Sequence, residues 1–288
     1  MAPRTRDRLL RDIYVVLAVA FVGLRLFDIE PWDQSVDAYA YWATGSGFEY
    51  GSTTGAMGAF LYSPAFAQAL APLTWLPWAA FNALWTAVGF TALWWLVGRW
   101  ALLSLLFLPI PFEITSGNIH LLLAVTIVMA FRYPAAWAFA LLTKVTPGVG
   151  LLWWVGRRDI RGVMHALAST GVIAAVSLVL APDLWRGWVD MLIADVGRPL
   201  ETVGWYLPVP LLPRLVVAAA LALWGGWTGR RWTVPVAVTL AMPVIWLNSL
   251  AVLTALVPLA QAARPAPASS DGSPAARFLI RDVREASA

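Results

Sequence analysis

A carboxylate and an ammonium group in contrasting surroundings are the side chains of this sequence best suited to chemistry. Asp37 lies in a polar stretch, residues 28–64, which holds five of the sixteen acidic residues and neither Lys nor Arg. Lys144 is the only lysine, and it follows ten residues after Pro134 within an apolar run. A carboxylate packed under aromatic rings has a raised pKa and can accept a proton from a hydroxyl group. A buried ammonium costs about 2.5–3.5 kcal/mol in a membrane, so it normally faces a cavity or an anionic partner such as phosphate.

A third polar group interrupts two short apolar runs. It is the sequence SGNIH, residues 116–120, which contains Asn118 and His120. Polar residues between short apolar runs are typical of a broken helix that lines a cavity. Counting membrane crossings places this turn at the cytoplasmic end, whereas a re-entrant segment would return it to the outer side. Both alternatives stay open from the sequence.

Each of these groups also has a purely structural interpretation. Asp37 could be a solvated surface acid, and Lys144 could form a structural pair with an acid such as Glu113. His120 alone is more often a packed polar group than a ligand. Arg25, near the outer end of the first apolar run, is either an arginine that extends to the membrane surface or a phosphate contact.

The composition predicts the kind of protein in which these groups work. The 288 residues are 60% hydrophobic and 12% charged, and the mean hydropathy is +0.71, so we predict a polytopic membrane protein. Cysteine is absent, which excludes disulfides and thiolate chemistry. Only two histidines are present, and no G-x-S-x-G, Gly-rich phosphate loop or DxD pair occurs. We therefore predict no metal and no cofactor, and we expect a lipid-linked substrate rather than a soluble sugar nucleotide.

The apolar runs predict an all-α fold of about 8–10 transmembrane helices in one domain, residues 1–260, followed by a disordered tail, 261–288. Arginines at the N-terminus place that end in the cytoplasm, so the 28–64 loop, with short interfacial helices, lies outside. An odd number of crossings would put the arginine-containing tail outside as well, and its side stays open. We count nine crossings: 13–27, 61–76, 78–98, 100–113, 118–131, 134–155, 163–181, 208–228 and 233–260.

Five short motifs, in order, carry a resemblance to a known family. They are V36-D37-x-x-x-Y41, F60-L-Y62-S-P64, P72-L73-x-x-L76-P77, S116-G117-N118-x-H120-L121-L122, and K144-V-T146-P147-G148 followed by R157-R158. Together they resemble the polyprenyl-phosphate-mannose-dependent mannosyltransferases of glycosyltransferase family 87, in the GT-C superfamily. The resemblance covers roughly residues 20–165. Beyond residue 180 it thins: the family's N-Q-S segment is not evident, and only Arg214 is retained.

The resemblance implies a sugar transfer on the outer face of a bacterial plasma membrane. The donor would be a polyprenyl-phosphate sugar, mannose first, and the acceptor a glycolipid or polysaccharide; membrane lipids are further partners and nucleic acid is not expected. Transfer would invert the anomeric centre, with Asp37 as general base. The remaining implied roles are donor-phosphate contacts by Lys144 with Arg198 or Arg25, a sugar or lipid groove shaped by Tyr41, Tyr62 and Trp42, and polar contacts by Asn118 and His120.

Two other functions fit the same features. A transporter or flippase of a lipid-linked sugar would need Lys144 and the broken helices but not Asp37. A catalytically inactive partner of a true transferase would fit the short C-terminal half. The sugar, the acceptor and the oligomeric state are not set by the sequence.

Overall fold

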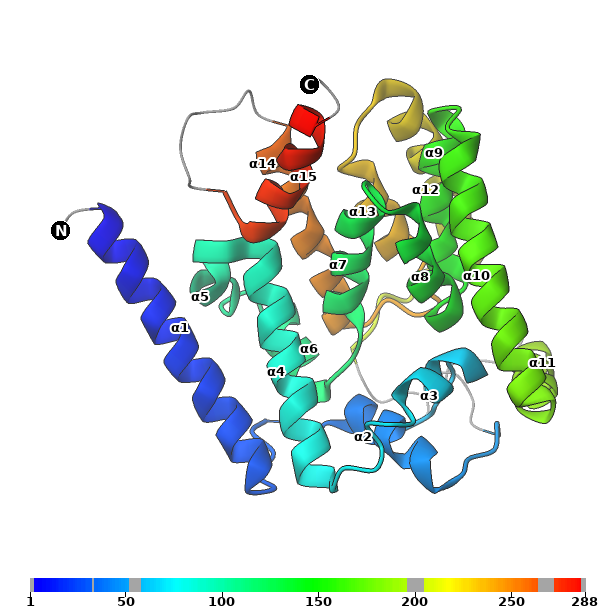
Figure 1. Cartoon of the computed structure of the whole chain (residues 1–288), viewed down its shortest axis with the longest axis horizontal. Helices are drawn as coiled ribbons and strands as arrows, with labels where there is room; N and C mark the ends of the chain where they lie inside the picture. The colour runs from blue at the N-terminus through cyan, green and yellow to red at the C-terminus, as the bar shows by residue number, and fades with distance from the viewer. Residues whose placement is uncertain (1–2, 33, 52–57, 196–204, 264–271, 286–288) are drawn as a thin grey trace.

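The fold is all-α in the computed structural model, which describes residues 3–32, 34–51, 58–195, 205–263 and 272–285 (Figure 1). This confirms the predicted fold class. In chain order the helices are α1 Pro3–Leu26, α2 Val36–Ala43, η1 Thr44–Ser46, α3 Pro64–Leu70, α4 Trp78–Val97, η2 Gly98–Trp100, α5 Ala101–Ser104, α6 Pro109–Ser116, α7 His120–Ala130, η3 Pro134–Ala136, α8 Trp137–Thr143, η4 Thr146–Leu151, α9 Leu152–Gly156, α10 Ile160–Leu180, α11 Pro182–Asp195, α12 Leu211–Thr228, α13 Thr233–Leu240, η5 Leu247–Ala255, α14 Leu256–Ala262 and α15 Pro274–Glu285.

Three of the described helices are long and apolar enough to cross a bilayer. They are the α4–α5 segment Trp78–Ser104, α10 and α12, and the bent pair α6–α7 would add a fourth span. This is fewer than the 8–10 we predicted. The helix α1 is 24 residues long, but Arg11, Asp12 and Arg25 interrupt its apolar sequence. The fold is that of a polytopic membrane protein in which several apolar runs do not form whole spans.

Prolines and glycines divide the runs that we had read as continuous spans. Only α3, seven residues long, forms within the predicted span 61–76, which is far too short for a hydrocarbon core of about 30 Å. The predicted span 134–155 is divided among η3, α8, η4 and α9, with Lys144 extended between two of them. The predicted span 233–260 breaks after α13, near Pro243. A proline removes a backbone donor and clashes with the preceding turn, so the apolar run continues while the helix ends.

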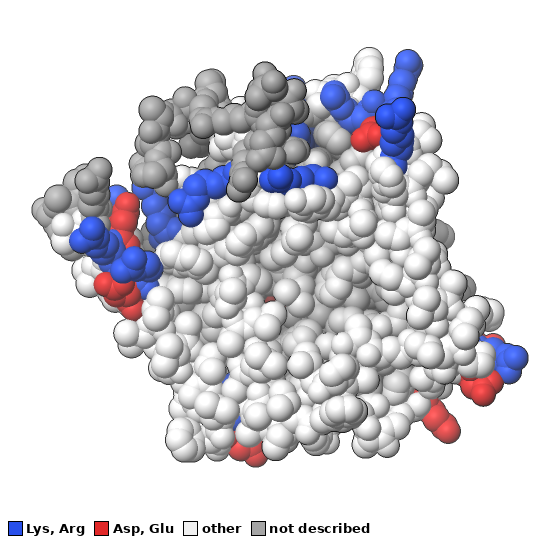
Figure 2. Space-filling view, viewed as in Figure 1, with Lys and Arg blue, Asp and Glu red and all other residues white. Residues whose placement is uncertain are grey.

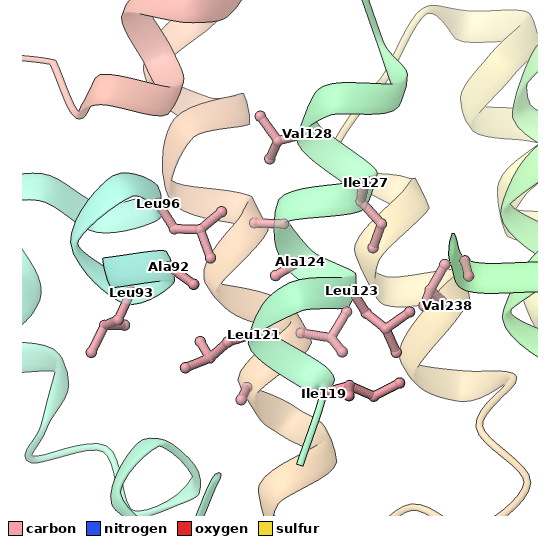
Figure 3. Close-up of a cluster of buried hydrophobic side chains, with 14 of the residues drawn as sticks. Ala92, Leu93, Leu96, Ile119, Leu121, Leu123, Ala124, Ile127, Val128 and Val238 are labelled. Atoms are coloured by element: carbon pink, nitrogen blue, oxygen red, sulfur yellow. The ribbon is translucent and has the colours of Figure 1, made fainter. Parts of the chain in front are cut away.

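The core lies between α4, α7 and η5, which are the elements nearest to the centre of the molecule. Figure 3 shows Leu93 and Leu96 of α4 facing Leu121 and Ala124 of α7, with Val238 of α13 on the far side of α7. All five side chains are almost wholly buried. This packing fixes α7, and therefore the polar turn that precedes it, against α4 and η5.

The two described ends of the chain lie at the same end of the molecule. Asp7 of α1 pairs with Arg99 of η2, and Gly98 lies directly against Ser273, which begins the C-terminal segment. We expected residues 261–288 to be a disordered tail, and the structure instead places α15 within that range, packed on α14 and α4. The reason is an amphipathic pattern that we overlooked, because Ala275, Ala276 and Leu279 form one buried face.

Candidate active site

The turn between α6 and α7 lies against α2. The two helices are bent by 106° at a short break, a geometry shared by a broken span and a re-entrant loop. Gly117 ends α6 with φ of 72°, a left-handed conformation that glycine adopts without steric cost. A Cβ on Gly117 would lie 2.6 Å from the Cβ of Ala38 in α2, so no larger residue fits there. Our two alternatives for SGNIH, a turn at the cytoplasmic end and a re-entrant segment, both stay predictions. The turn itself brings Asn118 to Asp37.

Two hydrogen bonds hold this turn in place. Trp85 of α4 donates its indole N–H to the Gly117 carbonyl at 2.6 Å. Ser35, the residue before α2, donates to the Thr115 carbonyl at 3.0 Å. The α6–α7 turn is therefore attached both to a spanning helix and to the loop that carries Asp37.

Arg25 stabilises the same junction and is not directed at Lys144. Its side chain is fully buried, forms an ion pair with Glu30, and donates to the Thr115 carbonyl at 2.9 Å. Glu30 also accepts a hydrogen bond from Asn82 at 2.8 Å, and the single hydroxyl proton of Ser35 is shared between Glu30 Oε2, at 2.8 Å, and the Thr115 carbonyl. We expected Arg25 to be either an arginine that extends to the membrane surface or a phosphate contact. Its contacts are those of a buried structural residue.

Loss of Arg25 is expected to destabilise the fold. Arg25→Met leaves the Glu30 carboxylate without its cation in a largely buried position, and the free energy of unfolding should fall by about 3–5 kcal/mol. Thermal unfolding in a neutral detergent measures it. The double variant Arg25→Met/Glu30→Met should recover much of the loss, and equal stability of wild type and the single variant would contradict this prediction.

Asp37 lies in the first turn of α2 and is half-buried. Burial raises the pKa of its carboxyl group above the ordinary range. The side-chain hydrogen bond from Asn118 and the positive charge of Lys144 lower that pKa in part, and the negative charge of Glu113 raises it. Because Asn118 Oδ1 accepts the Ile119 N–H at 2.8 Å, its amide N–H₂ is directed at the carboxylate. Asp37 is therefore a base that is stronger than an ordinary aspartate and fixed in direction.

Removal of the Asn118 amide is expected to change the pH dependence of activity. The amide stabilises the charged form of Asp37, so Asn118→Ala should raise the pKa of Asp37 further. If activity requires the carboxylate, the acidic limb of the pH–rate profile moves to higher pH. The control Gln68→Ala removes an amide that bonds to Ser177 instead, and its profile should match wild type. A shift to lower pH in Asn118→Ala would refute the assignment.

Two tyrosines complete the outer wall beside Asp37. The hydroxyl oxygens of Tyr41 and Tyr62 are 2.9 Å apart, and both rings are buried. Burial chiefly, with the negative charge of Asp37 as a further cause, raises the pKa of both phenols, so both remain protonated donors. Trp42 lies differently: its indole N–H bonds to the Leu76 carbonyl at 2.8 Å. The structure thus brings Tyr41 and Tyr62 to the site and packs Trp42 beside it.

A chain of three polar side chains links Lys144 to the start of α7. The Lys144 Nζ is 2.8 Å from His120 Nε2, and His120 Nδ1 is 2.8 Å from Glu113 Oε2. An ammonium can only donate, so Nε2 is the acceptor and Nδ1 carries the proton that Glu113 accepts. The other Glu113 oxygen, Oε1, accepts the backbone N–H groups of His120 and Leu121, at 2.5 and 3.2 Å. Lys144 is thereby oriented by His120, which is oriented in turn by the Glu113 carboxylate. The N-terminus of α7 fixes that carboxylate.

Residues of η5 supply a second polar wall that we did not predict. Ser249 Oγ is 3.3 Å from His120 Nε2, and Asn248 donates to Ser116 Oγ at 3.2 Å. The only signal in the sequence was a polar Asn-Ser pair after Pro243 within an apolar run. Arg214 acts behind this wall, since its guanidinium donates to four backbone carbonyls: Val209, Leu240, Met242 and Pro243.

The predicted site residues therefore fall into three groups. Asp37, Asn118, His120, Lys144, Tyr41 and Tyr62 gather in one place. Arg25 and Trp42 pack beside it as structural side chains. Arg198 lies outside the described residues, so its predicted role stays a prediction. Within the described part of the chain, no three His, Asp or Glu side chains are grouped so as to hold a metal ion.

Comparison with known proteins adds one result. The sequence model of glycosyltransferase family 87 matches residues 60–268, which is most of the chain and includes Lys144 and the α6–α7 turn. Asp37 precedes the matched range. No curated protein and no solved structure matches this chain.

Proposed function

Because this chain belongs to glycosyltransferase family 87, we propose that it transfers a sugar, mannose first, from a polyprenyl-phosphate donor to a glycolipid or polysaccharide hydroxyl. A glycosyltransferase needs a group that accepts the hydroxyl proton and a group that stabilises the leaving phosphate. Asp37 and Lys144 meet these needs, and their charges lie close enough for Lys144 to lower the pKa of Asp37. That convergence is the observation that carries the proposal.

The chemistry follows from the two charges. The Asp37 carboxylate takes the proton of the acceptor hydroxyl while that oxygen attacks the anomeric carbon. The bond from this carbon to the phosphate oxygen breaks, and the polyprenyl phosphate leaves with the electron pair. The Lys144 ammonium stabilises the charge that develops on that oxygen. A single displacement inverts the anomeric configuration.

A small cavity lies beside the site, between α4 and the α6–α7 turn. Its walls combine apolar side chains with the polar Glu113 and Asn118. The lining residues are Trp85, Val88, Gly89, Glu113, Ile114, Gly117, Asn118, Leu121 and Leu122.

The orientation is part of the proposal. Most described arginines lie at the end of the molecule opposite α2, and arginine-rich ends face the cytoplasm. Asp37 would therefore work on the outer face of a bacterial plasma membrane.

The direct test is transfer by the purified full chain in lipid vesicles. Radiolabelled polyprenyl-phosphate mannose serves as donor and a glycolipid extract as acceptor, and we expect a labelled product that forms only with both. Movement of the labelled donor across the vesicle membrane without any product would favour a flippase. Absence of both, with co-purification of an active transferase, would favour the inactive-partner alternative.

A further inference from the structure

Two turns of the chain carry the same three residues, Gly-Arg-Arg, and the fold places them side by side. The first is residues 156–158, between α9 and α10, and the second is residues 229–231, between α12 and α13. Helix α9 packs along α12. The Arg157 Nη1 atom is 3.6 Å from the position that a Cβ on Gly229 would take, so the cation of the first turn reaches the second.

Glycines allow this close approach. A Cβ on Gly156 would lie 2.3 Å from the Leu223 carbonyl oxygen, and one on Gly226 would lie 2.0 Å from the Trp153 carbonyl oxygen. The backbones of α9 and α12 therefore touch directly next to both turns. The position of the arginines relative to one another is thus set by rigid helix packing.

Three of the guanidinium groups lie over aromatic rings. A guanidinium has a planar fork of N–H donors, which matches two oxygens of one phosphate. The pairs, with the distance from guanidinium carbon to ring centre, are Arg157 over Trp153 at 5.9 Å, Arg230 over Trp224 at 5.0 Å and Arg231 over Phe131 at 5.1 Å.

Few acids lie near Arg157 and Arg230 in the sequence. Residues 152–163 contain one acid, Asp159, whose carboxylate accepts the Gly162 N–H at 3.0 Å. Residues 224–235 contain none. Arg158 has φ of 61°, a left-handed conformation that disfavours any side chain. Like charges gathered at a conformational cost would be stabilised by an anionic ligand.

The adjoining helices indicate what kind of anion this is. Helix α10 begins at Ile160 and α12 ends at Thr228, each directly beside one turn. Only 11% of the apolar stretch of α10 and 28% of that of α12 is buried, so both helices offer their sides to acyl chains. Trp227, at the same level, is 78% exposed. Figure 2 shows the corresponding end of the molecule, where blue side chains border a broad white surface.

We propose that the two Gly-Arg-Arg turns form a binding site for the phosphodiester headgroup of an anionic phospholipid, with its acyl chains along α10 and α12. The tendency of arginines to lie on the cytoplasmic side explains which end of the molecule carries them, but it does not require two adjacent turns whose guanidinium groups lie over aromatic rings. The site lies at the end of the molecule opposite α2, and therefore away from Asp37 (Figure 1). It is independent of the proposed transfer reaction.

The test uses native mass spectrometry of the full chain in detergent with added phosphatidylglycerol. Wild type should retain the lipid. Each arginine near an anionic headgroup contributes about a fivefold gain in affinity, so Arg157→Gln/Arg230→Gln should bind the lipid roughly thirtyfold more weakly. The matched control is Arg99→Gln/Arg132→Gln, which removes the same charge from the same end. These two arginines contact Asp7 and Phe278 instead, and the control should bind as wild type does.

Further measurements separate the alternatives. If the glutamine double variant fails to fold, Arg157→Lys/Arg230→Lys keeps the charge and loses the fork, and its binding should still fall measurably. Equal losses in both glutamine variants would show general surface charge and would overturn the proposal. So would equal retention of phosphatidylcholine by wild type. Tripolyphosphate should not match phosphatidylglycerol in raising the unfolding temperature, and if it does, the ligand is a soluble anion.

Discussion

Sugar transfer by Asp37→Asn should fall by about a hundred- to ten-thousandfold, which is the usual contribution of a general base. Asparagine keeps the size of the side chain and can still meet Asn118, but it cannot accept the acceptor's proton at neutral pH. The loss should appear in kcat, because the substrates' other contacts remain. Steady-state transfer from radiolabelled polyprenyl-phosphate mannose in vesicles measures it, with thermal unfolding as the check on folding.

Glu49→Gln is the matched control for this change. Glu49 lies in the same loop, is exposed, and loses the same charge on substitution. Its activity should equal that of wild type. Turnover by Asp37→Asn at the wild-type rate would remove Asp37 as the base and, with it, the main chemical argument for the proposed mechanism.

The residues proposed to carry the chemistry could be predicted because a charged side chain in apolar surroundings has a large free-energy cost. A lone lysine in an apolar run and an acid among aromatics each demand an explanation, whatever the helix count. The structure brings Lys144, Asp37 and Asn118 together, although no sequence pattern sets the distances between them. Polar groups are normally excluded from apolar surroundings, so an exception can be recognised even when the transmembrane spans are assigned wrongly.

The transmembrane spans were harder to predict. Hydropathy indicates that a segment is apolar, but it does not indicate that the segment forms one continuous helix. The run 134–155 is apolar apart from Lys144 and two threonines, yet the chain turns at Lys144 and Pro147 and never forms one helix. Such irregular backbone is tolerated at membrane depth only where protein surrounds it. We named Glu113 as a direct partner of Lys144, and the structure connects the two through His120. Ser249 could not be assigned, because its contact with His120 depends on how α7 packs against η5.

The α6–α7 turn explains why one site can draw on segments far apart in the chain. Thr115 and Gly117 receive hydrogen bonds from α1, α4 and the residue before α2, while the next residues begin α7. The Arg25–Glu30 pair holds the loop side of this junction. A change at Arg25 should therefore reach Asp37 through the Ser35 contact, without any contact between the two side chains.

Loss of the lysine should have the second large effect, because Lys144 acts on both halves of the proposed reaction. Lys144→Met removes the cation that stabilises the leaving phosphate, and kcat should fall by about a hundred- to a thousandfold, as when one electrostatic stabiliser is removed. The same positive charge lowers the pKa of Asp37. In its absence that pKa rises, so the remaining activity should require a higher pH than wild type before the carboxylate forms.

The two readouts together distinguish a catalytic charge from a merely structural one. Arg186→Gln removes one positive charge from an exposed position on α11, where Arg186 pairs with Asp183 at 2.8 Å. This control should leave both kcat and the acidic limb of the pH–rate profile unchanged. A structural defect in Lys144→Met would lower the amount of folded enzyme at every pH and leave the limb in place. A lower rate with an unshifted acidic limb would therefore show that Lys144 does not influence the pKa of Asp37. A shift of the acidic limb to lower pH would contradict their electrostatic coupling.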